Sequence, residues 1–254
     1  MIFLKQLMVT FIIYMSPLMN DQIFSMTDHD VQPKTIGTYE EDITGDGMKE
    51  RIKLKGYLLT TDSDYYRKVW AEISNPNGRE WKINYEGGYN PRLEFLSLTN
   101  NDATNILYQT ATKSNSDAYQ YSLHTMQNLE LKKTALPQQD HIIGNYKDSF
   151  IIELSLEPDE KPIIIDISHQ AKEYIAEGVY DEKGRVLHST SVHIEDISLF
   201  EPILRSDRNG YALKSYQHVK GRSDEDELGT IETIWTYENS AWTILKTKYV
   251  FPQQ

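Results

Sequence analysis

The chain has 254 residues, 39% of them hydrophobic, which is enough for one large core or two small ones. Its formal net charge of −12 argues against a nucleic-acid binder, because neutralising phosphates needs a basic surface. The absence of cysteine excludes disulfides, thiolate zinc sites and a cysteine nucleophile. These bounds fit a soluble exported protein.

The N-terminal segment, residues 1–19, carries one early lysine and then an apolar run that breaks at Ser16-Pro17. The run is shorter than the roughly 20 apolar residues that a membrane-spanning helix needs. Its composition is typical of the apolar part of a secretory signal peptide. Because no clean cleavage site follows, an uncleaved anchor is an alternative, and a buried N-terminal helix is another. We expect an extracytoplasmic protein that touches the membrane only through this segment.

Residues 20–35 are polar and are expected to form a linker, so the folded domain should span residues 36–254. Within it, apolar residues alternate with a period of two, which predicts β-strands. Alternating residues on both sides of Asn75-Pro76-Asn77-Gly78, at 69–73 and 81–85, predict a β-hairpin. Further strand pairs are expected at 119–123 with 129–131, 150–154 with 163–167, and 231–237 with 242–245.

Residues 150–154 and 163–167 are apolar on both faces, which favours central strands. A short helix is expected only at residues 168–176. The seventeen tyrosines and four tryptophans also favour strands, where core packing is a commoner role for them than sugar binding. The fold class predicted from these patterns is all-β.

An oxygen-rich turn at residues 42–50 leads directly into one of the predicted strands. Four oxygen-bearing side chains and one backbone carbonyl are spaced along it as candidate ligands: Asp42, Thr44, Asp46, Glu50 and the carbonyl of Met48. Gly47 at the sixth position allows a positive φ. This layout suits Ca²⁺, which prefers six to eight oxygens, but Lys53 stands where an EF-hand needs glutamate. The alternative is a polar turn that closes a hairpin without metal.

The loop resembles the calcium loops of FG-GAP/VCBS repeats, the blades of integrin-alpha-type β-propellers. It matches that motif at Asp42, Asp46, Gly47 and Glu50 and departs from it at Thr44, where the family usually has a carboxylate or amide. The resemblance implies a propeller-like domain with calcium bound at this loop. Residues 228–242 are also similar to the last strands of uncharacterised exported proteins of Firmicutes that carry such repeats, which implies bacterial origin and export.

Four turns precede apolar strands at a spacing of roughly 50 to 58 residues, as in propeller blades. They are Asp46-Gly47, Asn101-Asp102, Asp159-Glu160 and Asn209-Gly210. The spacing predicts a propeller-like array of about four antiparallel β-meander units, either closed or open. Asn105 and Leu213 stand in the second and fourth turns where Glu50 stands in the first, so we expect calcium at the first loop alone.

No catalytic motif is present: there is no His-Glu-x-x-His pair, no Gly-x-Ser-x-Gly elbow and no phosphate-binding glycine loop. We therefore expect a non-enzymatic protein that binds a protein or glycan of the cell envelope. The alternative is a secreted glycoside hydrolase with paired carboxylates, for which Glu153 and Asp166 are the candidates. Burial would raise the pKa of both, whereas at a sheet face they would meet solvent. A structural envelope protein without a small ligand is a third possibility.

Overall fold

The computed structural model describes residues 32–98, 104–114, 118–139, 141–157, 160–207 and 209–252. The chain divides into two units, Met1–Asp30 and Val31–Gln254, and every described residue belongs to the second. The predicted signal or anchor at residues 1–19 lies outside the described residues, as does most of the predicted linker. Within the described ranges, none of the helices has the length and apolar character needed to cross a membrane.

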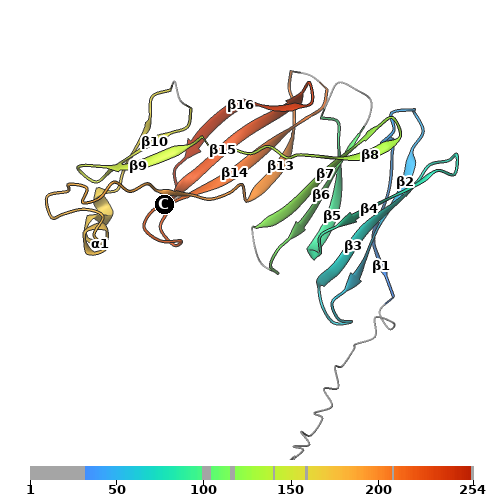
Figure 1. The fold of residues 1–254 in the computed structure, drawn as a ribbon, viewed down its shortest axis with the longest axis horizontal. Coiled ribbons are helices and arrows are strands. Elements are labelled where there is room, and N and C mark those ends of the chain that lie inside the picture. The colour runs from blue at the N-terminus through green and yellow to red at the C-terminus, as the bar shows by residue number, and fades with distance from the viewer. Residues whose placement is uncertain are drawn as a thin grey trace, which may run out of the picture. The chain divides into compact units, whose positions relative to one another are not determined.

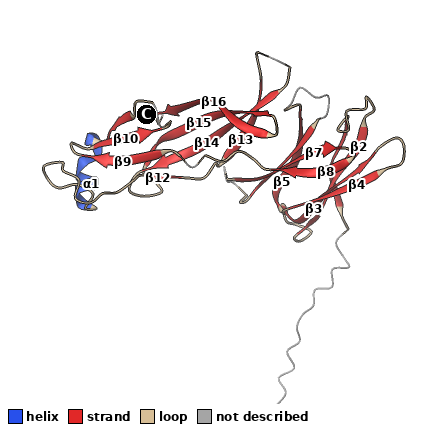
Figure 2. Cartoon of the chain, turned by 45° about the horizontal axis from the view of Figure 1, so that its top comes forward, coloured by secondary structure: helices blue, strands red, loops and turns tan. Residues whose placement is uncertain are grey.

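Antiparallel strands make up most of the described chain, so the all-β prediction is confirmed (Figures 1 and 2). The first sheet has eight strands in the order β1-β2-β3-β5-β6-β7-β8, with β4 also paired to β3. They are β1 (Lys34–Glu41), β2 (Glu50–Leu58), β3 (Tyr65–Ser74), β4 (Glu80–Tyr85), β5 (Gly88–Leu96), β6 (Asn105–Ala111), β7 (Tyr119–Gln127) and β8 (Glu130–Thr134).

The remaining strands form a three-stranded sheet and a five-stranded sheet (Figure 1). The smaller one contains β9 (Ile143–Lys147), β10 (Ile151–Ser155) and β11 (Ile163–Asp166). The larger one contains β12 (His193–Ile194), β13 (Leu199–Leu204), β14 (Tyr211–Lys220), β15 (Glu227–Glu238) and β16 (Ala241–Val250). A short helical segment lies between β11 and β12, with η1 (Ser168–Gln170) followed by α1 (Ala171–Ala176), as the sequence predicted.

The predicted hairpin at residues 69–85 is confirmed as β3 and β4. Ala71 faces Ile83 across the two strands, and both side chains are buried. The turn is closed by Asn75, whose side-chain Oδ1 accepts a hydrogen bond from the Arg79 amide at 2.8 Å. Gly78 takes a φ of 81°, which the absence of a Cβ makes easy. Turn chemistry and apolar alternation therefore agree on one register.

The prediction of two central strands is right for β10 and wrong for β11. β10 lies between β9 and β11, whereas β11 is an edge strand. Its outward residue Ile164 is 51% exposed. The apolar outer face of β11 did not indicate an edge position, because the place of a strand in a sheet depends on its pairing and not on composition alone.

The four-unit propeller is not seen, because the described strands pair as sheets of eight, three and five. The strands after the predicted turns do exist as β2, β6, β11 and β14, but β2 and β6 belong to the same sheet. A turn followed by a strand is a local signal, whereas the grouping of strands depends on which apolar faces pack together. β6 is buried along its whole length, as expected for a strand inside a large sheet.

Three apolar clusters form the core of the described chain. The first packs on the inner face of β2, β3, β4 and β6, and the second lies beneath β9, β10, β11 and α1. The third combines Leu107 and Leu123 of the eight-stranded sheet with Phe200, Leu213 and Trp235 of the five-stranded sheet. Trp70 and Trp235 are buried, in line with the predicted packing role of the tryptophans.

Candidate functional site

The predicted calcium loop is organised by Glu50, the first residue of β2, which is fully buried. Its Oε2 accepts hydrogen bonds from the amides of Ile43 at 3.0 Å and Thr44 at 3.3 Å. Asp42 accepts from the amides of Gly45 at 2.7 Å and Gly47 at 2.8 Å. The loop carboxylates therefore hold the backbone of their own turn.

The five candidate ligands meet only in part. The hydroxyl of Thr44 lies 3.4 Å from Asp42 Oδ1 and 3.3 Å from Glu50 Oε1, so three of the five come together. The Asp46 carboxylate accepts a hydrogen bond from the Met48 amide at 2.8 Å, and Met48 is exposed. Among the residues that the structure describes, no group of three or more His, Cys, Asp or Glu side chains could hold a metal ion. Calcium binding at this loop stays a prediction.

The two carboxylates considered for glycoside hydrolysis lie on the outer face of the three-stranded sheet. Glu153 is partly exposed and pairs with Lys147 at 3.4 Å. Asp166 is exposed and accepts a hydrogen bond from the Ser168 amide at 2.8 Å. Hydrogen bonding by Ser168 lowers the pKa of Asp166, the opposite of what a general acid needs. Of the two environments considered from the sequence, burial and a solvent-facing sheet face, both carboxylates have the second.

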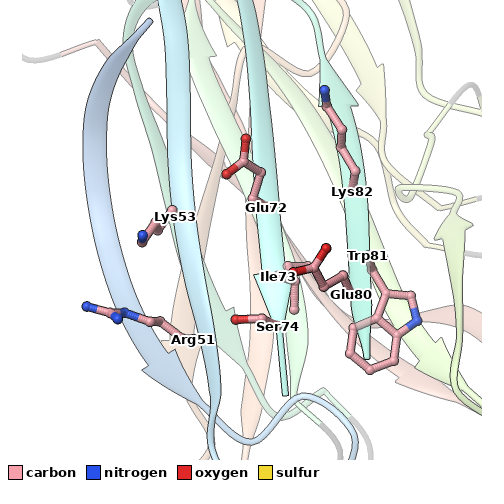
Figure 3. A pocket seen from close by; sticks show the side chains of 8 residues that line it. All are labelled: Arg51, Lys53, Glu72, Ile73, Ser74, Glu80, Trp81 and Lys82. Atoms are coloured by element: carbon pink, nitrogen blue, oxygen red, sulfur yellow. The ribbon is translucent and has the colours of Figure 1, made fainter. Parts of the chain in front are cut away.

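A charged groove of about 510 Å³ crosses the outer face of β2, β3 and β4 (Figure 3). β2 contributes Arg51 and Lys53, and β4 contributes Glu80 and Lys82. These side chains share one face because the register sets Lys53 opposite Glu72, and Glu72 opposite Lys82. The groove therefore collects charge from three adjacent strands.

Within the groove the charges differ in how they are paired. Glu72 is bound by Lys55 at 2.7 Å and by Trp70 Nε1 at 2.8 Å, and these hydrogen bonds lower its pKa. Within the described residues, neither Arg51 nor Lys53 makes an ion pair or a side-chain hydrogen bond. Arg51 and Lys53 thus lie side by side on one strand, and neither forms an ion pair with a carboxylate of the described residues.

A second hollow, a cleft of about 840 Å³, lies on the five-stranded sheet beneath the segment that joins β8 to β9. Its lining includes Gln139 of that segment, Gln217 of β14, and Trp235. Neither glutamine was predicted as a site residue from the sequence. The sequence did contain one indication of the cleft: Gln217 carries an amide at a position on the buried face of an alternating strand, where an apolar residue is normal.

The groove was not predicted from the sequence either. Its signal was the alternation in Arg51-Ile52-Lys53-Leu54-Lys55, which places three cations on one face of a single strand. None of the residues that the structure brings together in the groove or the cleft was among the predicted ligands.

The fold places the chain among all-β proteins built from antiparallel sheets. A family model described as the YybI C-terminal domain matches residues 140–250, the part that contains β9 to β16. The chain is 22% identical over 201 residues to the "Uncharacterized protein YybI" of Bacillus subtilis (strain 168), which covers 76% of each protein. No solved structure matches.

The predicted membership of the FG-GAP/VCBS family is therefore wrong, because the matching family model and relative are both of the YybI type. The resemblance depended mainly on residues 42–59, which lie outside the matched range of 140–250. An acidic Asp-Gly turn before a strand is a local solution to closing a hairpin, so it arises in unrelated β-proteins.

Proposed function

We propose that this chain is an exported, non-enzymatic binding protein that holds an anionic polymer of the cell envelope in the groove of β2, β3 and β4. The observation that carries the proposal is the pair Arg51 and Lys53, adjacent on one face and without a carboxylate partner among the described residues. Export is inferred from the composition of residues 1–19.

The chemistry of the groove favours repeated anionic groups. Arg51 offers a planar guanidinium that can bind a phosphate or carboxylate through two hydrogen bonds, and Lys53 adds a compact charge beside it. Lys82 lies on the third strand, its ammonium 5.1 Å from the ring centre of Trp70, so the positive charge extends across the sheet. Glu72 is already paired with Lys55, whereas Glu80 in the lining and Glu40, opposite Arg51 on β1, are carboxylates that oppose the ligand.

A flexible polymer fits better than a folded acidic protein. The chain as a whole carries a net charge of −12, so a large acidic surface would be repelled outside the groove. A single strand of a glycan or a polyol phosphate is narrow. It can place its charged groups in the groove while bringing few other charges close to the acidic surface around it.

Titration of the whole chain with inorganic polyphosphate and with polygalacturonate tests the proposal, because the two polymers separate phosphate from carboxylate recognition. We expect one of them to bind, with affinity that falls as salt rises. The double variant Arg51→Glu with Lys53→Glu should bind at least about tenfold more weakly. The matched control Lys172→Glu with Lys183→Glu changes two exposed lysines elsewhere and should bind like the wild type.

Failure of both polymers to bind, or equal binding by the two double variants, would reject the groove as the site. That result would leave the structural envelope protein as the better description. The glycoside hydrolase alternative has no supporting observation in the positions of Glu153 and Asp166. The predicted four-blade arrangement plays no part in the proposal.

A further inference from the structure

A row of polar side chains crosses the inner face of the five-stranded sheet, between the second and third apolar clusters. It consists of Ser215 and Gln217 on β14 and Thr233 on β15, each at most 3% exposed. Ser215 and Thr233 are paired across the strands, and their neighbours along this face are apolar. Polar groups buried this deeply need hydrogen-bond partners, so the row is a costly feature that core packing does not require.

Most of the row is paired internally. Trp235 Nε1 donates to the Ser215 hydroxyl at 2.8 Å, and the Thr233 hydroxyl donates to Gln139 Oε1 at 2.7 Å. Gln217 Nε2 donates to the backbone carbonyls of Gln139 at 3.4 Å and Glu195 at 3.2 Å. The segment between β8 and β9 is thereby tied to the sheet through Gln139.

Two atoms of this network are left over. Gln139 Nε2 and Gln217 Oε1 have no hydrogen-bond partner among the described residues, although the side chains are 8% and 3% exposed. They are complementary, since the first is a donor and the second an acceptor. Both glutamines line the 840 Å³ cleft, which has the size of a small-molecule site.

We propose that this cleft binds an N-acetylated amino sugar of a glycan. A secondary amide has one carbonyl, which can accept from Gln139 Nε2, and one N–H, which can donate to Gln217 Oε1. A carboxylate offers no donor and an ammonium offers no acceptor, so neither satisfies both atoms. A sugar hydroxyl both donates and accepts, so it is the competing group that cellobiose tests. The proposal goes beyond the charged groove of β2, β3 and β4, which lies on a different sheet and is proposed to bind anions.

The rest of the lining suits a sugar ring. The partly exposed Trp242 supplies aromatic surface for the apolar face of a pyranose, and the exposed carboxylate of Asp196 can accept hydrogen bonds from hydroxyl groups. A peptide also contains secondary amides, but an extended peptide usually adds to a free strand edge. The cleft lies over β14 and β15, which have paired strands on both sides.

The test uses the whole chain with three disaccharides: di-N-acetylchitobiose, its deacetylated form and cellobiose. We expect the acetylated sugar to bind at least about tenfold more tightly than the other two, because they cannot present the amide. Its binding should shift the side-chain amide signals of Gln139 and Gln217 in ¹H–¹⁵N spectra. Tryptophan fluorescence should change with the acetylated sugar and not with cellobiose, since Trp235 and Trp242 line the cleft.

Gln139→Leu should weaken binding of the acetylated sugar at least about tenfold. Gln127→Leu is the matched control, since Gln127 is an exposed glutamine at the end of β7 that does not line the cleft, and it should bind normally. If Gln139→Leu does not fold, the amide signals and the fluorescence of the wild type show whether the acetylated sugar binds in the cleft. No binding of the acetylated sugar, equal binding of cellobiose, equally tight binding of N-acetylalanine methylamide, or full binding by a folded Gln139→Leu would each overturn the proposal.

Discussion

The carboxylate of Glu50 accepts a hydrogen bond from the amide of Ile43, seven residues earlier in the chain, at 3.0 Å. Asn105 repeats this contact, since its Oδ1 accepts from the amide of Leu98, also seven residues earlier, at 3.3 Å. Glu50 begins β2 and Asn105 begins β6, and both side chains are buried. In each case the first residue of a strand anchors the backbone that enters the preceding loop.

Glu50→Ala should lower the free energy of unfolding by about 2–3 kcal/mol, because the buried amide of Ile43 loses a charged acceptor. Urea denaturation in the presence of a calcium chelator measures this effect without any contribution from metal. Asp46→Ala is the control: among the described residues the Asp46 carboxylate accepts from the Met48 amide alone, at the exposed tip, so the substitution should cost about 0.5 kcal/mol or less. Equal losses in the two variants would contradict the anchoring role.

Calcium at the same loop predicts a separate effect on thermal stability. Millimolar Ca²⁺ should raise the melting temperature of the wild type, because a cation offsets the repulsion between Asp42, Asp46 and Glu50. At ten times the dissociation constant the gain is about 1.4 kcal/mol. Asp46→Ala should abolish the rise, and Mg²⁺ should not reproduce it, since Mg²⁺ demands a stricter octahedral geometry. An unchanged melting temperature in the wild type removes calcium from the description of this protein.

The buried hydrogen bond from the Tyr174 hydroxyl to Asp226 Oδ2, at 2.6 Å, predicts a large effect of a small change. Tyr174→Phe should lower the free energy of unfolding by about 1.5–3 kcal/mol, because the bond involves a charged acceptor that stays buried. Tyr180→Phe is the matched control, since its hydroxyl donates to the neutral carbonyl of Ile151 at 3.0 Å. It should cost about 1 kcal/mol. A control as damaging as Tyr174→Phe would mean that ring packing, and not the carboxylate, sets the cost.

The stability of the fold should depend on pH through His124. Burial, with a smaller contribution from Lys133, lowers the pKa of His124 to about 4 from an ordinary value of 6.5. His124 therefore binds a proton more readily in the unfolded chain than in the folded chain. Its protonation lowers the free energy of unfolding as the pH falls from about 6.5 to about 4. The full size of this effect is about 3 kcal/mol.

His124→Phe keeps a ring against Tyr85, whose ring centre is 5.7 Å away, and removes the titrating group. The variant should lose less stability than the wild type between pH 7 and pH 5 in urea titrations. His188→Phe, at an exposed histidine, should follow the wild type. Parallel pH profiles for all three proteins would show that His124 is not responsible.

Local features of the fold could be predicted from the sequence because they depend on neighbouring residues. The turn at Asn75-Pro76-Asn77-Gly78 and the alternation on either side of it specify β3 and β4 without help from the rest of the chain. The same holds for the short helix at residues 168–176. Strand grouping could not be predicted in this way, since β2 and β6 follow turns that look alike in the sequence yet belong to one sheet of eight.

The sequence by itself determined the all-β class, the hairpins and the charged face of β2. The tertiary structure alone decided what stands beside that face, because the register of three strands puts Lys53 of β2 and Lys82 of β4 on either side of Glu72 of β3. It also made the amide cleft, where Gln139 meets Thr233 from 94 residues away. The periodicity of the sequence indicates which face of a strand is buried. A binding site depends in addition on which distant segments pack against that face.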